Sequence, residues 1–377
     1  MWSRRCHARP LGDVDSGKIR APAARRYIIA AAMETEGEAT MIRAAILGIG
    51  HWGRMLVGAV QGKSSAIRFT AGATRTRAKA AAFCAEHGIA LHDDLDAILA
   101  DPAIDAVVCA TPHSEHGGQV ERIAAAGKAV FMEKPFTLDR NSAARALDAV
   151  ARAGIVLGVA YPRRFHPNMK ELKARIDTGR LGTIAHCYAE QNTPAGLFMA
   201  PESWRATAEE APAGGMTALG VHNVDALIHL FGTIDEVYAK SLRRAVSYAA
   251  DDTTSVMFGL ANGMSATLVC SLVTAASYRL AVFGDKGSGE LLTPNLDFHF
   301  TPVPAERPTG RHAALPPEII EHRSFNALLA ELEAFAGAIE GGAPYPIPAD
   351  QVLHAVAVFE AIVQSAAAGR PVRVARD

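Results

Sequence analysis

The chain has 377 residues, more than one ordinary domain needs and enough for two. Hydrophobic residues make up 49% and charged residues 20% of the sequence, so a large core can form and global disorder is excluded. The formal net charge is −1 and the body of the chain contains no basic run, which argues against nucleic acid as the main partner.

The apolar stretches and the cysteines of the sequence indicate where the protein is located. No apolar stretch approaches the length that spans a membrane, so we expect no membrane partner. The five cysteines are scattered and form no C-x-x-C pair, which indicates ordinary thiols in a reducing compartment. The sequence therefore predicts a cytoplasmic protein with neither a disulfide framework nor a metal site.

Residues 1–40 differ from the rest of the chain. They begin with an arginine-rich stretch without apolar periodicity, and the short apolar run 27–33 is followed by glutamates. This run is too short for a convincing signal sequence. We expect a disordered extension, or a mis-assigned start with Met33 or Met41 as the functional beginning; a targeting peptide is the alternative.

From residue 41 to residue 160, apolar runs typical of strands alternate with patterns typical of helices. The strand-like runs are 42–48, 66–73, 104–110, 128–132 and 155–160, and the helix-like segments are 54–61, 76–87, 93–99, 114–126 and 141–153. This alternation predicts βαβ units and a doubly wound parallel sheet that is covered on both faces. Ligands of such sheets bind at the carboxyl ends of the strands.

Residues 161–377 follow a different pattern, which predicts an α+β domain with an open, mostly antiparallel sheet. Helices are expected at 169–177, 220–230, 325–336 and 350–367, and strands at 183–191, 234–242, 252–260, 264–272 and 278–283, with turns at 259–263 and 284–289. The loop 194–212 contains Trp204 and Arg205 and is either a substrate wall or a plain surface connection. An exposed sheet face favours a homodimer or homotetramer.

The first apolar run ends in G-x-G-x-x-G, formed by Gly48, Gly50 and Gly53, and a helix-like segment follows. In a dinucleotide site these glycines allow the tight turn, the approach of the pyrophosphate and close helix–strand packing. The alternative is a glycine-rich turn that binds nothing. In context, the pattern predicts a Rossmann domain over 41–160, with these cofactor-binding residues in the loop: Gly48, Ile49, Gly50, His51, Trp52 and Gly53.

The end of the second strand bears on the choice of cofactor. An acidic residue commonly holds the ribose 2′-hydroxyl of NAD at this position, but here Thr74 occupies it, with Arg75 and Arg77 beside it. Guanidinium groups can hold a 2′-phosphate bidentately, which favours NADP over NAD. Alternatively, the two arginines simply start a solvated helix.

Two further loops follow strands at the same edge of the sheet. Thr111, Pro112 and His116 follow one strand, and Glu133 and Lys134 follow the next. Pro135 pins Lys134 over the cofactor crevice, and the bond between them is a candidate for the cis form. Alternatively, Lys134 is a surface lysine in a turn, and His116 is a histidine in the first turn of a helix with no catalytic role.

These motifs, in this order and spacing, resemble the glucose–fructose oxidoreductase/inositol dehydrogenase/MocA family. The resemblance rests on 48–53, A-T-P-x-x-x-H at 110–116 and E-K-P at 133–135, and it continues in 161–167, in 214–225 and in the tail 349–372. It covers roughly residues 41–372. Each motif alone is weak evidence for the family, but several motifs in the same order and spacing are strong evidence.

The resemblance implies hydride transfer between a nicotinamide and a hydroxyl-bearing carbon, often of a sugar or polyol. It implies that Lys134 and His222 are catalytic, and their chemistry agrees with this. A histidine that titrates near neutrality suits proton transfer, and an ammonium group stabilises a developing alkoxide. We also expect Tyr161, Arg164 and His166 to shape or contact the substrate. Alternatively, His222 is a packing residue of its helix.

One position departs from the family pattern. Many members carry an aspartate four residues before that histidine, completing a lysine–aspartate–histidine relay, but this chain has Ala218. Asp225, on a shared helical face with His222, either orients it, belongs to the substrate site or pairs structurally. The departure leaves open proton transfer without a relay, a different substrate class such as an imine or tetrapyrrole-like compound, and a non-catalytic dinucleotide-binding regulator.

Overall fold

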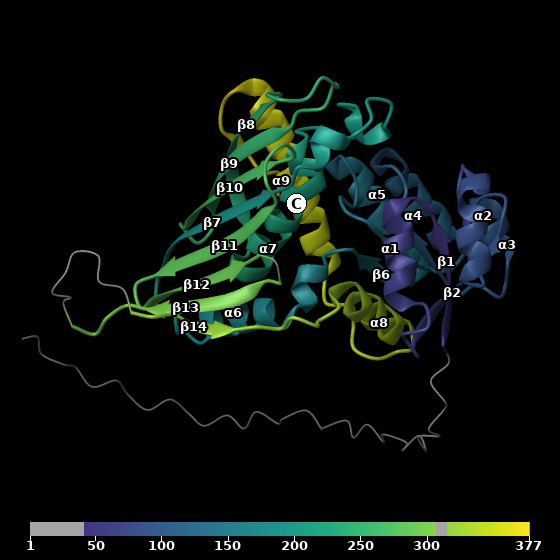
Figure 1. The fold of residues 1–377 in the computed structure, drawn as a ribbon, viewed down its shortest axis with the longest axis horizontal. Coiled ribbons are helices and arrows are strands. Elements are labelled where there is room, and N and C mark those ends of the chain that lie inside the picture. The colour runs from purple at the N-terminus through teal and green to yellow at the C-terminus, as the bar shows by residue number, and fades with distance from the viewer. Residues whose placement is uncertain (1–40, 294, 307–314, 377) are drawn as a thin grey trace, which may run out of the picture. The chain divides into compact units, whose positions relative to one another are not determined.

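A computed structural model describes residues 41–293, 295–306 and 315–376. The expectations for residues 1–40 lie outside the described residues. All of the described residues belong to one unit by their contacts. The two sheets that the sequence predicts are both present (Figure 1).

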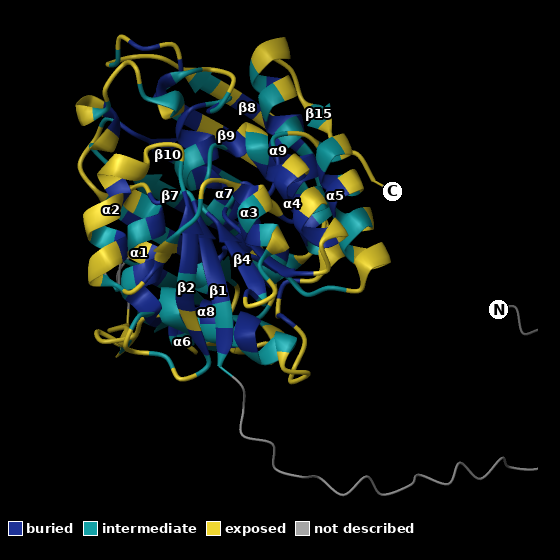
Figure 2. Cartoon of the chain, turned by 90° about the vertical axis from the view of Figure 1, so that its right-hand side faces the viewer, coloured by how far each residue is buried: buried dark blue, intermediate teal, exposed yellow. Residues whose placement is uncertain are grey.

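The first sheet is parallel throughout and has six strands in the order β3-β2-β1-β4-β5-β6. Its strands are β1 (Ile42–Leu47), β2 (Ile67–Ala73), β3 (Ala90–Leu91), β4 (Ala106–Cys109), β5 (Ala129–Met132) and β6 (Leu157–Val159). Every residue of β4 and β5 is buried, as expected for strands covered on both faces (Figure 2). The strand order reverses between β1 and β4, which creates a crevice at their carboxyl ends.

Five helices accompany this sheet, and two of them begin at a side-chain cap. They are α1 (His51–Val60), α2 (Arg77–Glu86), α3 (Leu95–Ala100), α4 (His116–Ala125) and α5 (Arg140–Ala153). The carboxylate of Asp139 accepts a hydrogen bond from the Ser142 amide at 2.8 Å and caps α5. Gly154 ends that helix in the left-handed region at φ 64°, as the sequence predicts.

The second sheet has nine strands in the order β14-β13-β12-β11-β7-β10-β9-β8-β15, and every neighbouring pair is antiparallel except β7 with β10. The mostly antiparallel sheet is therefore confirmed. Its strands are β7 (Ile184–Asn192), β8 (Ile234–Leu242), β9 (Thr253–Leu260), β10 (Ser265–Ser271), β11 (Ser277–Gly284), β12 (Gly287–Leu292), β13 (Asp297–Pro302), β14 (Glu318–Ile320) and β15 (Val372–Arg373).

The predicted turn at 284–289 is wrong in its second half, because β12 already begins at Gly287. The two glycines of this strand, Gly287 and Gly289, leave room for neighbouring side chains. A Cβ on Gly287 would lie 2.7 Å from the Phe300 ring, and one on Gly289 would lie 2.9 Å from Leu172. Glycines that admit a neighbouring side chain look the same in a sequence as glycines that turn the chain.

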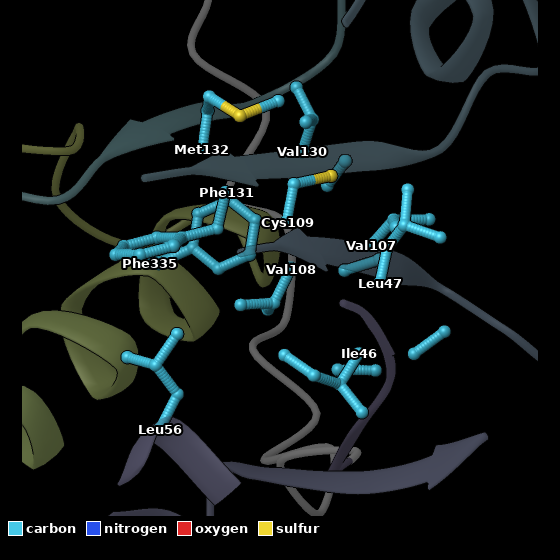
Figure 3. Close-up of a cluster of buried hydrophobic side chains, with 14 of the residues drawn as sticks. Ile46, Leu47, Leu56, Val107, Val108, Cys109, Val130, Phe131, Met132 and Phe335 are labelled. Carbon is cyan, nitrogen blue, oxygen red and sulfur yellow. The ribbon is translucent and has the colours of Figure 1, made fainter. Parts of the chain in front are cut away.

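Helices from the second half of the sequence pack on both sheets. They are α6 (Pro167–Asp177), α7 (Val221–Phe231), α8 (Ala327–Ile339) and α9 (Ala349–Ala368). Phe335 of α8 is fully buried in the core of the first sheet, with its ring centroid 5.5 Å from that of Phe131 (Figure 3). Val356 of α9 belongs to this first core, while Phe359 belongs to the core of the second sheet. The chain therefore returns to the Rossmann half after the second sheet.

Helix α9 corrects the expectation that no apolar stretch is long enough to span a membrane. Its 20 residues, with a mean hydropathy of 1.3, are long and apolar enough to cross a membrane by length and composition. Half of that stretch is buried inside the protein, and core helices of soluble proteins pass the same test. This feature by itself is weak support for a membrane span.

The packing of α8 predicts that Phe335→Ala lowers the free energy of unfolding by about 3–5 kcal/mol, because it leaves a cavity beside Phe131. Denaturant-induced unfolding of the full chain measures this loss. The matched control is Phe198→Ala, since the Phe198 side chain is 83% exposed and its loss changes stability little. Equal effects of the two substitutions would contradict the assignment of α8 to the first core.

Candidate active site

A cavity of about 730 Å³ lies where the carboxyl ends of the first sheet's strands meet the second sheet. Its size is in the range of small-molecule sites. The polar residues of its wall come from the start of α1, from the segments after β4, β5, β6, β7 and β12, and from β7 and β11 themselves. They are His51, Trp52, Thr111, His113, Glu133, Lys134, Arg163, Gln191, Asn192, Thr193, Arg205, Ser277, Tyr278 and Thr293.

The three glycines after β1 have different roles. Gly48 has φ 92°, and a Cβ there would lie 2.5 Å from the carbonyl oxygen of Ala110. A Cβ on Gly53 would collide with the carbonyl of Gly48. A Cβ on Gly50, in contrast, would meet no atom within 4 Å. The outer two glycines are therefore required by packing, and the middle one leaves open space beside the backbone.

That open space fits a dinucleotide phosphate. Helix α1 begins directly after Gly50, and no side chain caps it, so its first amide groups can donate to a ligand. His51 and Trp52 in the first turn line the cavity, whereas Ile49 is buried in the core. The residues present therefore fit a bound nicotinamide dinucleotide.

The residues predicted to read the 2′-phosphate lie at the exposed end of β2. Arg77 is engaged by the Asp93 carboxylate and by the carbonyl oxygen of Leu91, at 3.2 Å. The Arg75 side chain is 75% exposed. Its contact with Glu115 is long, at 3.6 Å between a guanidinium nitrogen and a carboxylate oxygen. Thr74 follows the last residue of β2. Arg75 is therefore the more available of the two guanidinium groups.

The loop after β4 is tied to the loop after β5. Thr111 lines the cavity, and its hydroxyl donates to Gln119 at 2.7 Å. The two ring nitrogens of His116 lie 2.8 Å from the Pro135 carbonyl oxygen and 3.2 Å from that of Thr111. His116 is fully buried and absent from the cavity wall, so it joins the loops. Pro112 directly precedes the short helical turn His113–Glu115.

Lys134 carries the chemistry expected of this site. Its peptide bond to Pro135 is cis, as the sequence suggested. The side chain lines the cavity, and its Nζ donates a hydrogen bond to the carbonyl oxygen of Ala218 at 2.7 Å. Burial lowers the pKa of Lys134 to about 8, helped by Arg205 and Arg163 and opposed by Glu133. The reading of Lys134 as an ordinary surface lysine is therefore wrong.

Glu133 supports the cavity wall beside Lys134. Its side chain accepts hydrogen bonds from the Trp52 indole N–H and, at 3.2 Å, from the backbone N–H of Lys134. Burial raises the pKa of this carboxyl group, while Lys134 and Trp52 oppose the rise. Glu133 thus fixes the orientation of Trp52 at the start of α1.

His222 lies in the first turn of α7, half-buried, with its ring edge against the Tyr161 ring at a centroid distance of 6.2 Å. Its Nδ1 is buried without a hydrogen-bond partner, and its side chain is not part of the cavity wall. Burial, with further contributions from Lys134 and Arg163, lowers its pKa well below the usual value. The ring is therefore neutral at physiological pH.

The segment before α7 explains how the site is arranged without the usual aspartate. Residues Met216–Gly220 form one π-helical turn, a feature that the sequence pattern did not predict. This turn directs the backbone carbonyl of Ala218 at the Lys134 amine. A main-chain oxygen thus provides the acceptor at the position where the family resemblance leads one to expect a carboxylate.

The four residues predicted to contact substrate do not form part of the described cavity wall. Arg164 and Asp225 form a buried ion pair at 2.6 Å, and Arg164 also donates to Gln351. His166 accepts a hydrogen bond from the Asn168 amide at the start of α6, and Tyr161 is buried against His222. Arg164 and Asp225 therefore satisfy each other, and Asp225 follows the structural alternative.

Other residues reach the cavity that sequence reasoning did not single out as site residues. Arg163 comes from the turn Pro162–Phe165, and Arg205 comes from the loop that the sequence marks as a candidate substrate wall. The Nδ1 of His113 lies 2.6 Å from the carbonyl oxygen of Glu210. Burial lowers the pKa of this histidine to about 3. No cluster of metal-ligating side chains is found among the described residues.

Comparisons with known proteins agree with this geometry. A family model described as "Oxidoreductase family, NAD-binding Rossmann fold" matches residues 42–161, and one described as "GFO/IDH/MocA C-terminal domain" matches residues 169–290. Inositol 2-dehydrogenase of Rhizobium meliloti (strain 1021) is 31% identical, covering 89% of this chain and 99% of that protein. The rhizopine catabolism protein MocA of Rhizobium meliloti is 28% identical, covering 86% and 95%. A solved structure of levoglucosan dehydrogenase with NADH has a TM-score of 0.78 at 20% identity, covering 90% and 100%.

The glycine geometry predicts opposite results for two small substitutions. Gly50→Ala leaves the melting temperature nearly unchanged but weakens dinucleotide binding by about 10-fold or more, because the methyl group fills the phosphate space. Gly53→Ala lowers the melting temperature, since its methyl group collides with the Gly48 carbonyl. Thermal unfolding and fluorescence titration with NADPH and NADH separate these effects. Unimpaired binding by Gly50→Ala would contradict the placement of the phosphates.

Proposed function

Because this chain belongs to the GFO/IDH/MocA family of oxidoreductases, we propose that it transfers a hydride between NAD(P) and a hydroxyl-bearing carbon of a sugar, polyol or related small molecule. The observation that carries the proposal is the buried amine of Lys134 on the wall of a cavity that the dinucleotide loop also lines. The family and its NAD-binding Rossmann domain are established by the comparisons.

Lys134 supplies the acid–base chemistry in this proposal. A bound nicotinamide accepts the hydride when an alcohol is oxidised, and the hydroxyl proton must leave at the same time. With a pKa of about 8, Lys134 is neutral in about one molecule in ten at pH 7 and can accept that proton. In the reverse direction its ammonium form donates the proton and stabilises the developing alkoxide. The carbonyl of Ala218 holds the amine in place.

His222 is the second proton carrier that we propose. Burial and the charges of Lys134 and Arg163 disfavour a protonated ring, so His222 would act as a relay that takes a proton on one ring nitrogen while it releases one from the other. Its Nδ1 has no hydrogen-bond partner among the described residues. His222 lies in the first turn of α7, the helix that directly follows the turn presenting Ala218 to Lys134. A proton can then pass from Lys134 to this part of the site without the aspartate that Ala218 replaces.

We propose NADP as the preferred cofactor and Arg75 as the residue that selects it. The support is the exposed guanidinium after β2, which has only a long contact with Glu115, together with Thr74 in the usual place of an acidic residue. A carboxylate at that place would repel a 2′-phosphate, whereas a guanidinium attracts it.

We also propose a cytoplasmic homodimer or homotetramer that acts on a small molecule, with neither nucleic acid nor membrane as partner. The support for association is the face of the second sheet, where Tyr238 and Met257 are directly paired across β8 and β9 and are 42% and 59% exposed. Large apolar side chains in register on an open sheet favour coverage by a second copy.

Replacing Lys134 by methionine keeps most of the side-chain volume but removes the acid–base group. We expect Lys134→Met to lower kcat by about 100- to 10,000-fold, with the Kd for NADPH changed by only a few-fold. The wild-type kcat/KM for alcohol oxidation should rise as the pH increases through about 8, because the neutral amine is the active form, and the variant should lose this rise. Undiminished turnover by the variant would refute the role, whereas tight NADPH binding without wild-type turnover would favour a regulator.

The cofactor proposal predicts that Arg75→Ala weakens NADPH binding about 10-fold while NADH binding stays nearly constant. Fluorescence titrations of the wild type and the variant with both nucleotides measure the two Kd values. Arg68→Ala is the matched control, because Arg68 is an exposed arginine on β2, the strand that precedes Arg75. If Arg75→Ala weakens both nucleotides equally, this guanidinium does not read the 2′-phosphate.

A further inference from the structure

The charges on the cavity wall are unbalanced. Besides two histidines, it carries three basic side chains, Lys134, Arg163 and Arg205, but only one carboxylate, Glu133. Glu133 already accepts hydrogen bonds from Trp52 and from the backbone N–H of Lys134. Neither Arg163 nor Arg205 forms an ion pair with another residue that the structure describes. The cavity therefore has an excess of positive charge.

Arg163 is held rigidly yet incompletely satisfied. Its guanidinium carbon lies 4.1 Å from the centroid of the Tyr278 ring, which fixes its plane. Its Nη1 is buried and has no hydrogen-bond partner. The neighbouring Arg164 shows the opposite condition, because it donates to both carboxylate oxygens of Asp225. A buried charged donor without an acceptor is costly, and no acceptor for Nη1 is found among the described residues, so an acceptor on a ligand would stabilise this part of the Arg163 guanidinium.

Arg205 approaches the same cavity from the loop that follows β7. Its guanidinium carbon lies 3.9 Å from the centroid of the Trp204 ring. The loop is anchored to the first half of the chain through Glu210, whose carboxylate accepts hydrogen bonds from the amide and hydroxyl of Ser114. A second, positioned guanidinium group therefore faces the ligand space.

The part of the wall formed by the end of β7 is neutral and polar. Asn192 donates its amide N–H to the Ser277 hydroxyl at 2.9 Å, and the side-chain oxygen of Gln191 accepts from Asn223 at 3.1 Å. These bonds orient the two amides and leave the Gln191 N–H groups and the Asn192 oxygen for a ligand. Donors and acceptors of this kind match hydroxyl groups.

We infer that the substrate is a polyhydroxylated compound with an anionic group, a carboxylate or a phosphate, which Arg163 and Arg205 bind while Gln191 and Asn192 contact its hydroxyl groups. The inference rests on the proposed function. In the oxidation, the carbon's C–H electron pair leaves as hydride to the nicotinamide, the O–H proton goes to Lys134, and a ketone forms. The anionic group is unchanged, and planar guanidinium groups suit either oxyanion.

Matched substrates test this inference. Glucose, glucuronate and glucose 6-phosphate form one set, and galactose, galacturonate and galactose 6-phosphate form another. We expect kcat/KM at saturating NADP⁺ or NAD⁺ to be at least about 10-fold higher for an anionic member than for its neutral partner. The preferred anion distinguishes carboxylate from phosphate. A ratio near one in both sets, for turnover and for binding, would overturn the inference.

Four variants test whether the preference depends on Arg163 and Arg205. Arg163→Gln should lower the anionic-to-neutral ratio by about 10-fold, towards one, and Arg163→Lys should retain part of the preference because the charge remains. Arg68→Gln removes an exposed charge outside the cavity and should leave the ratio unchanged. A ratio that persists in both Arg163→Gln and Arg205→Gln would refute the assignment.

Binding measurements separate this inference from the proposed dehydrogenase activity. Calorimetry of the wild-type protein loaded with NADPH gives the affinity for each sugar without turnover. Anion-dependent binding that is lost in Arg163→Gln supports the site even where no compound is oxidised, a result that would count against hydride transfer. Oxidation of neutral sugars with no anion preference would leave the dehydrogenase intact and overturn the inference.

Discussion

A single hydrogen bond, from the Nζ of Lys134 to the carbonyl oxygen of Ala218, connects the end of β5 with the turn that leads into α7. It joins residues 84 positions apart and lies on the wall of the central cavity. The desolvation that comes with this position lowers the pKa of Lys134 to about 8. Positioning and acid–base function of the amine thus have the same structural origin.

The two sheets are held around this bond by packing and by charge pairing. Helix α9 contributes residues to both cores, and α8 returns to the first. The buried pair of Arg164 and Asp225 lies between the turn after β6 and α7. Each of these charges requires the other, because an isolated buried charge is strongly destabilising. Behind the cavity, Arg164 and Asp225 thus neutralise each other, whereas Arg163 and Arg205 line the cavity itself.

Sequence reasoning succeeded where chemistry is encoded locally. The parallel sheet, the bounds of β8 and the placement of Lys134 all followed from periodicity or from a short motif. It failed where a contact is made at long range. Gly287 looks like a turn residue because the Phe300 ring that requires it is remote in sequence. Likewise, no local pattern shows that Arg164 pairs with Asp225, 61 positions away, while its neighbour Arg163 faces the cavity.

Isotope transfer tests the central claim most directly. The protein is incubated with NADP⁺ or NAD⁺ and with sugars and polyols that carry deuterium on every hydroxyl-bearing carbon, and the nicotinamide is analysed by mass spectrometry. If the cavity is a site of hydride transfer, the reduced nicotinamide gains a single deuterium from a compound of the panel. Tight nucleotide binding with no deuterium in the nicotinamide from any compound would contradict the account.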